Sequence, residues 1–302
     1  MKHNMQILQE KAREFGPLCV GLDTDPSYIP ECVIKQYSSP AEAVLAYNKA
    51  IIQKVQRDGS ASCFKVQIAY YEAMGLEGMK VYAETVKLCR QSGLVCISDI
   101  KRGDIANTAK AYAKAHFEGE FETDIVTVNP YMGFDTLTPW TDYCAKGKAL
   151  FVLLRTSNPG MKDIEQKNLV NGGRVLDEVG NELNRIFAET KNTFADQTCS
   201  PVGAVVGCTE ESDARALRDA HPDILFLIPG YGAQGGDAKI CATLMEKAGG
   251  VVNSSRGILC AWKKDSEVAA KVEDGTATME DIAEAAARAS VASKKDLLSY
   301  VK

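Results

Sequence analysis

The sequence predicts a (β/α)8 barrel of parallel strands. Short apolar runs rich in valine, isoleucine and leucine recur eight times, and longer segments with helical spacing lie between them. Runs of this kind are typical of parallel strands that are buried on both faces and joined by helices. Eight such units are what a (β/α)8 barrel requires. The predicted strands are residues 17–23, 61–67, 94–100, 125–130, 150–156, 202–207, 223–229 and 250–256.

A doubly wound open sheet is the competing architecture. That fold usually carries a glycine-rich GxGxxG turn directly after the first strand. Residues 21–26 read GLDTDP, which does not match this motif. The barrel is therefore the favoured prediction.

The segments between the strands show the apolar spacing of amphipathic helices, with residues at i, i+3 and i+4. The longest connection, about 45 residues between the fifth and sixth strands, includes a predicted helix near 175–190. No linker or low-complexity tract divides the chain. We therefore expect a single domain over 1–302 with an elaborated loop at about 157–200. The other predicted helices are residues 41–57, 70–91, 106–117 and 282–293.

Composition excludes several broad classes of function. The 302 residues are 45% hydrophobic and 25% charged, with a net charge of −5, which argues against a general binder of nucleic acid or of membrane surfaces. No run of 18 apolar residues is present, so no transmembrane helix is expected. Residues 1–16 are amphipathic and predict an opening helix in place of a signal peptide. These features favour a cytoplasmic protein.

Ten cysteines occur without any CxxC pair, and most lie inside apolar runs, as Cys63 and Cys96 do. A reduced thiol in such a position behaves as a small hydrophobic group. We therefore expect buried, inert thiols in a reducing compartment, with no metal or redox role. The three histidines lie outside every motif discussed below, which weakens any proposal of a zinc site or a histidine base.

Charged residues recur where the predicted strands end. The carboxyl ends of the strands form the active face of a (β/α)8 barrel. Residues i and i+2 of a strand share a face, so Asp99 and Lys101 are expected to point the same way. One interpretation is that these residues form exposed ion pairs with the surrounding helices, each worth only about 0–1 kcal/mol. The alternative is a buried cluster, in which the charges must neutralise one another. Clusters of ionisable groups in a cleft are typical of functional sites. The residues in question are Asp23, Lys65, Asp99, Lys101, Asp104 and Arg256.

A lysine between carboxylates suits one kind of chemistry. Neighbouring negative charge favours the ammonium form, so the lysine is a poor Schiff-base nucleophile, which requires a depressed pKa. An ammonium group can instead donate a proton to a carbanion. An adjacent carboxylate would repel a carboxylate on the substrate. The pattern therefore favours decarboxylation or protonation of an enolate.

The segment DIKRGDI at residues 99–105 resembles the DxKxxDI signature of the orotidine 5′-phosphate decarboxylase family. Further blocks extend the resemblance over almost the whole chain: PLCVGLDTDP, FKVQIAYYE, TVNPYMGFDTL, LLRTSNPG and IPGYGAQGGD. The resemblance implies a (β/α)8 barrel that converts orotidine 5′-phosphate to uridine 5′-phosphate and carbon dioxide in pyrimidine biosynthesis, with no metal or other cofactor. The opening block and the long fifth connection resemble the longer-chain branch of the family.

The resemblance also implies roles for the charged residues. Lys101 would donate a proton to carbon 6 of the pyrimidine ring after carbon dioxide leaves, and Asp99 would lie beside the substrate carboxylate. Lys65 and Asp104 would complete the alternating array. Asp104 and Thr108 would reach into the site of a second subunit, so the resemblance implies a homodimer with shared sites.

Substrate-binding residues follow in the same way. The resemblance places Asp23 at the ribose hydroxyls and Ser157 at the pyrimidine edge, although Thr156 is adjacent. Gln234 and Arg256 would hold the phosphate, with Pro229 in the same loop. Barrels commonly bind phosphate with the segments after the seventh and eighth strands, and the glycines of PGYGAQGGD would let backbone N–H groups approach an anion.

Two alternatives remain open. A magnesium-dependent sugar-phosphate decarboxylase or hexulose-phosphate synthase of the same barrel type could use Asp23, Asp99 and Asp104 as metal ligands. Metal dependence would discriminate it from the nucleotide enzyme. A phosphate-binding regulator without activity is the non-enzyme alternative, but such a protein would normally lose a member of the charged array, and all members are present.

Overall fold

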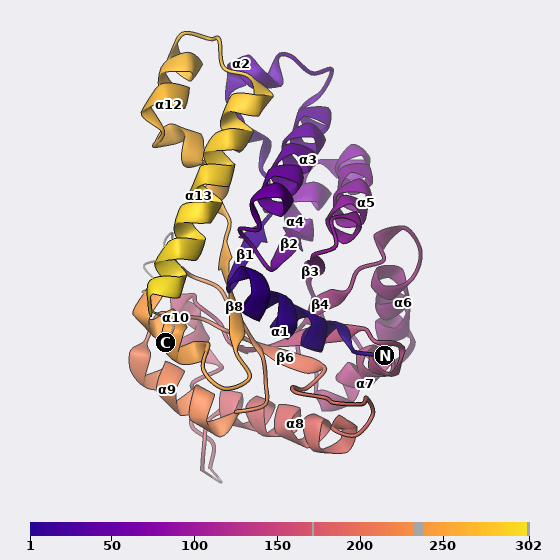
Figure 1. Cartoon of the computed structure of the whole chain (residues 1–302). Coiled ribbons are helices and arrows are strands. Elements are labelled where there is room, and N and C mark those ends of the chain that lie inside the picture. The colour runs from indigo at the N-terminus through magenta and orange to yellow at the C-terminus, as the bar shows by residue number, and fades with distance from the viewer. Residues whose placement is uncertain (171, 232–237, 301–302) are drawn as a thin grey trace.

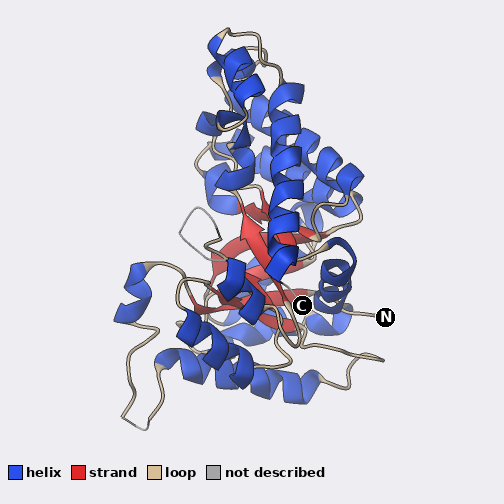
Figure 2. Ribbon diagram, turned by 60° about the vertical axis from the view of Figure 1, so that its left-hand side comes forward, coloured by secondary structure: helices blue, strands red, loops and turns tan. Residues whose placement is uncertain are grey.

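A computed structural model describes residues 1–170, 172–231 and 238–300. Eight parallel strands pair in chain order, and the last pairs with the first, so the barrel is closed (Figure 1). The strands occupy the centre of the molecule and the helices surround them (Figure 2). The predicted (β/α)8 barrel is confirmed. The strands are β1 (Leu18–Gly21), β2 (Cys63–Gln67), β3 (Val95–Arg102), β4 (Ile125–Val128), β5 (Ala149–Arg155), β6 (Val202–Val206), β7 (Phe226–Ile228) and β8 (Gly250–Ser254).

The helices fill the connections between strands. The longer helices are α1 (Asn4–Phe15), α3 (Pro40–Asp58), α5 (Gly75–Gln91), α6 (Ala106–Phe117), α8 (Val175–Thr190), α9 (Glu211–Ala220), α10 (Ala238–Leu244), α12 (Ser266–Glu273) and α13 (Met279–Tyr300). Shorter ones are α2 (Glu31–Ile34), α4 (Ile68–Glu72), α7 (Thr138–Thr141) and α11 (Arg256–Leu259). Single 3₁₀ turns are η1 (Pro26–Tyr28), η2 (Gly119–Phe121), η3 (Phe134–Leu137), η4 (Cys144–Lys146), η5 (Pro159–Asp163) and η6 (Ala261–Lys263).

One predicted helix, residues 70–91, is divided in the structure. The α4 helix ends at Glu72, and α5 begins at Gly75, whose φ of +69° is left-handed and cannot continue a helix. Gly78 then lies so close to the preceding turn that a Cβ there would be 2.0 Å from the Tyr71 carbonyl oxygen. The apolar spacing runs through both helices, so it could not reveal the break.

The strand residues alternate between two buried layers. Side chains on one face pack outward against the helices, and those on the other face fill the barrel interior. The opening helix α1 closes the interior at the amino ends of the strands, where Met5 and Leu8 are completely buried. The barrel interior is therefore apolar from α1, at the amino ends of the strands, as far as their carboxyl ends. Its strand residues include Cys19, Cys63, Val95, Ile97, Ile125, Phe151, Leu227 and Val251.

The C-terminal helix α13 packs beside α3 and completes the ring of helices (Figure 1). The hydroxyls of Ser60 and Ser290 are 2.7 Å apart between these regions, and Lys54 donates to Glu284 at 2.8 Å. The α3 helix itself begins at a capped position, where Ser39 accepts from the Glu42 N–H. It ends at Gly59, which adopts a left-handed conformation.

Most of the cysteines and all three histidines lie in the interior. Eight of the ten cysteine side chains are buried. Burial raises the pKa of Cys144 and of Cys199 to about 12, so both stay protonated. His3, His116 and His221 are buried, and burial lowers the pKa of each to about 4.

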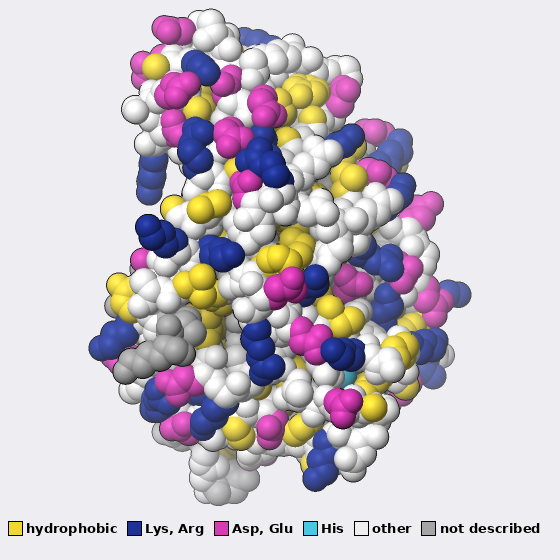
Figure 3. Space-filling model, viewed as in Figure 1, with side chains coloured by type: hydrophobic (Ala, Val, Ile, Leu, Met, Phe, Trp, Pro, Cys, Tyr) yellow, Lys and Arg dark blue, Asp and Glu magenta, His cyan; other side chains and the backbone are white. Residues whose placement is uncertain are grey.

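The outer surface in Figure 3 carries basic and acidic side chains interspersed. That mixture differs from the basic surface that a nucleic-acid-binding protein presents. No helix in the described part of the chain is both long and apolar enough to span a bilayer.

Candidate active site

A cavity of about 650 Å³ opens at the carboxyl ends of the strands. Each of the eight strands, or the segment directly after it, contributes to its lining. This is the end of the barrel where active sites form. Representative lining residues from β1 to β8 in order are Asp23, Lys65, Asp99, Thr127, Leu153, Val205, Leu227 and Asn253.

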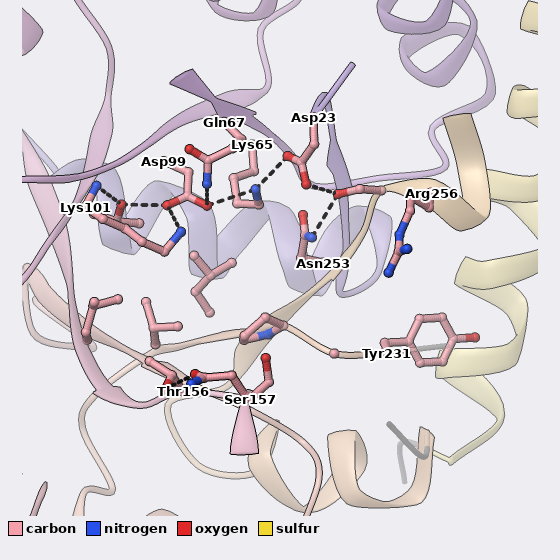
Figure 4. A pocket seen from close by; sticks show the side chains of 18 of the residues that line it. Asp23, Lys65, Gln67, Asp99, Lys101, Thr156, Ser157, Tyr231, Asn253 and Arg256 are labelled. Carbon is pink, nitrogen blue, oxygen red and sulfur yellow. Dashed lines mark hydrogen bonds and ion pairs between the residues drawn. The ribbon is translucent and has the colours of Figure 1, made fainter. Parts of the chain in front are cut away.

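Four charged side chains form a continuous array in this cavity. Lys65 Nζ donates to Asp23 Oδ1 at 2.9 Å and to Asp99 Oδ2 at 3.0 Å. Lys101 Nζ donates to the other oxygen of Asp99 at 2.6 Å (Figure 4). The order is therefore Asp23, Lys65, Asp99, Lys101, with alternating sign and no net charge. These residues come from three adjacent strands and their ends, which the pairing of β1, β2 and β3 brings together.

Asp99 is saturated with hydrogen-bond donors. Gln67 Nε2 donates to Oδ2 at 2.9 Å, and Thr127 Oγ1 donates to Oδ1 at 2.8 Å, in addition to the two lysines. The Asp99 side chain is only 7% exposed. Burial alone would raise the pKa of this carboxyl, but the ammonium groups of Lys65 and Lys101 outweigh it and hold the pKa well below its usual range. Asp99 therefore stays ionised and fixed.

Lys65 is held in its charged form in the same way. Its side chain is 6% exposed, and burial alone would lower its pKa. The carboxylates of Asp23 and Asp99 outweigh that effect and raise the pKa of Lys65 above its usual range. A buried ammonium between two carboxylates satisfies the requirement that interior charges be paired.

A β-bulge brings Lys101 next to Asp99. The pairing of β3 with β4 shifts register between Ser98 and Arg102, and Lys101 has a φ of +45°. Thr127 Oγ1 accepts the N–H groups of Ile100 at 3.0 Å and of Lys101 at 2.9 Å. The two side chains do meet, as expected, but regular strand alternation is not the reason. A left-handed non-glycine residue costs about 1–2 kcal/mol, which the bonds to Thr127 offset.

Residues at the end of β8 position the Asp23 side chain. Its Oδ2 accepts from Ser255 Oγ at 2.7 Å, and Asn253 Nδ2 donates to Ser255 Oγ at 3.1 Å. Gly21 makes room for this contact, because a Cβ at that position would lie 1.9 Å from Ser255 Oγ. The glycine in VGLD is thus required by the site above it.

Arg256 follows β8 at the start of α11 and lines the cavity with Pro229 and Gly230. Its guanidinium is exposed and forms no ion pair with any residue that the structure describes. A free arginine beside a glycine turn is suited to an anionic group. Gln234, which was predicted to share this role, lies outside the described residues.

Ser157 lies on the opposite side of the cavity from the charged array (Figure 4). Its hydroxyl has no hydrogen-bond partner in the described chain. The neighbouring Thr156 is engaged, because its Oγ1 lies 2.7 Å from both Asn158 Oδ1 and Glu165 Oε1. Of the two candidates for the fifth strand, Ser157 is therefore the one free to meet a ligand.

Asp104 and Thr108 do not line the cavity of their own chain. Asp104 Oδ1 accepts the N–H of Ile105 at 2.8 Å, and Thr108 is exposed on α6. Within one chain, Asp23 forms the end of the array through its contact with Lys65. That the two residues enter a second subunit's site stays a prediction.

Several site residues were missed from the sequence: Gly21, Gln67, Thr127, Asn253 and Ser255. The segments FKVQ (64–67), TVNP (127–130) and NSSRG (253–257) contain four of them, but only Lys65 and Arg256 of these segments are predicted site residues. Gln67 and Thr127 occupy the same inward register as Lys65 and Asp99 on neighbouring strands. This shared register is the signal by which Gln67 and Thr127 could have been recognised as site residues.

Comparison with known proteins identifies the family. A profile described as "Orotidine 5'-phosphate decarboxylase / HUMPS family" matches residues 16–272. The chain belongs to this family. The predicted resemblance is thereby confirmed.

Individual relatives agree with the profile. The chain is 50% identical over 258 residues to the orotidine 5'-phosphate decarboxylase of Clostridium perfringens (strain 13 / Type A), a match that covers 85% of this chain and 88% of the relative. It is 48% identical over 269 residues to the enzyme of that name from Clostridium botulinum (strain Langeland / NCTC 10281 / Type F), covering 88% and 93%. The solved structure of Leishmania donovani OMP decarboxylase superimposes with a TM-score of 0.68 at 27% identity, covering 92% of this chain and 98% of that one.

The Thr127 hydroxyl is expected to matter for activity beyond its effect on stability. Thr127→Val removes the acceptor of two N–H groups and the donor to Asp99, so Lys101 should lose its position. We expect kcat/KM for orotidine 5′-phosphate, the substrate in the family's name, to fall about 10- to 100-fold.

The matched control is Thr123→Val. Thr123 is completely buried just before β4, and its hydroxyl donates to the Cys96 carbonyl of β3 at 3.0 Å, away from the cavity. Both variants should lower Tm, because each leaves a buried polar group unpaired, but only Thr127→Val should lower turnover. Equal kcat/KM values for the two variants would contradict the role of the bulge.

The array should withstand mild acid. The pKa of Asp99 lies below its unfolded value of about 4, so its contribution to stability is present above that pH and lost as the pH falls toward the depressed pKa. The Tm difference between wild type and Asp99→Asn, measured at a series of pH values, should be constant from about pH 8 to 5 and shift in favour of the variant below about pH 4. A shift that begins near neutral pH would show that Asp99 does not hold a depressed pKa.

Proposed function

We propose that the chain catalyses decarboxylation of orotidine 5′-phosphate to uridine 5′-phosphate and carbon dioxide in pyrimidine biosynthesis. The observation that supports this most strongly is the alternating array of Asp23, Lys65, Asp99 and Lys101 at the mouth of the barrel. The names of the relatives at 48–50% identity support the same reaction.

The cavity suggests one orientation of the nucleotide. Arg256, with Pro229 and the undescribed Gln234, would hold the phosphate at the ends of β7 and β8. Asp23 would accept hydrogen bonds from the ribose hydroxyls. The pyrimidine ring would then lie between the charged array on one side and Ser157 on the other, which Figure 4 shows facing each other across the cavity.

The chemical step follows from the charges. Asp99 remains ionised, so it repels the substrate carboxylate and favours its departure. The bond from carbon 6 to the carboxylate breaks, carbon dioxide leaves, and the electron pair stays on carbon 6. Lys101 then donates a proton from its ammonium group to carbon 6. The Lys101 side chain is 45% exposed, which gives the resulting amine access to water for reprotonation.

The array also favours this reaction over the magnesium-dependent alternative. The ammonium group of Lys65 occupies the space between Asp23 and Asp99, where a shared cation would have to bind. Asp104, the third proposed ligand, lies outside the cavity. Among the described residues, no three His, Cys, Asp or Glu side chains gather closely enough to hold a metal ion. The proposed step needs no cofactor, because fixed charges stabilise the carbanion.

A homodimer with shared sites is part of the proposal. Asp104 and Thr108 follow β3 without lining the cavity of their own chain. The neighbouring loops expose large apolar side chains, with Ile105 at 52%, Tyr131 at 75% and Met132 at 51% exposure. The two loops are joined, since the Asn129 N–H donates to the Arg102 carbonyl at 2.8 Å. This face suits a second copy that brings its own Asp104 and Thr108 to the site.

The same proposal treats residues 1–302 as a single domain that acts in the cytoplasm. The long connection at about 157–200 is an elaboration of that domain, because its helix α8 packs against β5 and β6 of the same barrel.

The reaction is tested by following the ultraviolet absorbance of orotidine 5′-phosphate with purified protein and a chelator. We expect the substrate band to disappear with the wild type and turnover by Lys101→Ala to fall at least about 1,000-fold, within the range of general acid catalysis. An unchanged spectrum, together with activity on a ketose phosphate that magnesium restores, would support the sugar-phosphate alternative instead.

Shared sites are tested by mixing two inactive variants, Lys101→Ala and Asp104→Ala, under conditions that exchange subunits. In a mixed dimer one site carries both changes and the other carries neither. A one-to-one mixture should therefore recover about a quarter of wild-type activity, because half of the dimers hold one intact site.

The control mixes Lys101→Ala with Lys65→Ala. Both residues serve the site of their own chain, so every site in that mixture stays damaged and no activity should return. Recovery in the control, or none with Asp104→Ala, would refute sharing of the site.

A further inference from the structure

We propose that Glu165, in the connection between β5 and α8, is a positioning residue for recognition of the pyrimidine. It would fix the turn at Thr156 so that Ser157 presents its hydroxyl to the edge of the base. This inference rests on the proposed function, and it assigns a purpose to the long connection.

Glu165 binds one neighbour with both carboxylate oxygens. Its Oε2 accepts the Thr156 backbone N–H at 2.8 Å, and its Oε1 accepts from Thr156 Oγ1 at 2.7 Å. Hydrogen bonds to an ionised acceptor are stronger than neutral ones, and two of them fix orientation as well as distance. Ser157 follows directly in the chain, so the direction of its side chain depends on this clamp.

The backbone of Glu165 is itself held by hydrogen bonds within the connection. The Glu165 N–H donates to the Met161 carbonyl at 2.8 Å, and its carbonyl accepts the Leu176 N–H at 2.9 Å. Met161 and Leu176 are buried in the apolar region between the connection and the barrel. Glu165 is therefore anchored on both sides to packed residues and does not act as a loose surface side chain.

Ser157 is also confined from the side of β6. A Cβ at Gly207 would lie 2.9 Å from Ser157 Cα, so the missing side chain lets the turn pack directly on this strand end. The Gly207 N–H donates to the Arg155 carbonyl at 2.8 Å. The turn is thus enclosed between β6 and the connection, and Glu165 closes the open side.

A second tie joins the connection to the same turn through Asp213 on α9. The fully buried Arg155 lies 3.5 Å from Asp213, which also accepts from Gln166 at 2.7 Å and from Arg174 at 3.1 Å. Arg155 precedes Thr156, while Gln166 and Arg174 belong to the connection. Asp213 therefore links the residue before the turn to the connection.

The experiment compares two ligands that differ only in the base. Uridine 5′-phosphate carries the pyrimidine, and ribose 5-phosphate lacks it. For Glu165→Ala we expect the Kd of uridine 5′-phosphate to rise about 10- to 100-fold, as the loss of a charge-assisted contact implies, with the Kd of ribose 5-phosphate unchanged. Glu165→Gln keeps one oxygen for the Thr156 N–H and should give an intermediate Kd.

Glu178→Ala is the matched control. Glu178 lines the same apolar region, but its carboxylate has no hydrogen bond or ion pair within the described chain. This variant should bind both ligands as the wild type does. Equal weakening of both ligands by Glu165→Ala would show a merely structural role and overturn the inference.

Ser157→Ala separates this inference from the proposed function. If it weakens binding of uridine 5′-phosphate while Glu165→Ala does not, the positioning role fails and the assigned function stands. If the wild type binds no uridine 5′-phosphate at all, the proposed function fails and the inference fails with it.

Discussion

The structure of the site depends on one buried ammonium group, that of Lys65. It stands directly above the apolar interior of the barrel, where an unpaired charge would cost several kcal/mol. Pairing with Asp23 and Asp99 removes that cost, and these carboxylates come from the strands on either side. The strands β1, β2 and β3 must therefore pair in this register, because otherwise the buried charge of Lys65 would lack its partners. The same constraint leaves Asp99 fixed and ionised before any substrate arrives.

The other half of the array depends on a local departure from regular strand geometry. Lys101 contacts Asp99 with its amine half-exposed, from a backbone that leaves regular strand geometry with a φ of +45°. Thr127 holds the bulge through two backbone groups and at the same time donates to Asp99. One hydroxyl thus couples the backbone strain to the orientation of the carboxylate. Such preorganisation lets fixed charges act without rearrangement during the reaction.

Much of this could be predicted from the sequence, because strand order and helix periodicity are local signals. The eight strands and the charged residues at their ends followed from apolar runs and from where those runs stopped. What could not be predicted depends on tertiary contacts. Ser255 is small and uncharged, so nothing in the sequence distinguishes it from an ordinary turn residue, and the contact of Thr127 with Asp99 depends on the pairing of β3 with β4. The pairing of Asp23 with Lys65 could not be predicted either, because it requires knowing which strand ends face one cavity.

The two sides of the cavity are built differently, and the difference has a chemical reason. The charged side stands on strands, whose hydrogen-bonded ladder holds Lys65 and Asp99 to within the tolerance that proton transfer demands. The side with Ser157 is a turn, and a turn has no ladder of its own to restrain it. Contacts outside the turn must restrain it, and the buried Arg155 and the carboxylate of Glu165 provide them. A long connection after β5 is therefore more than a tolerated insertion, since it provides the second wall that a turn needs to read a base.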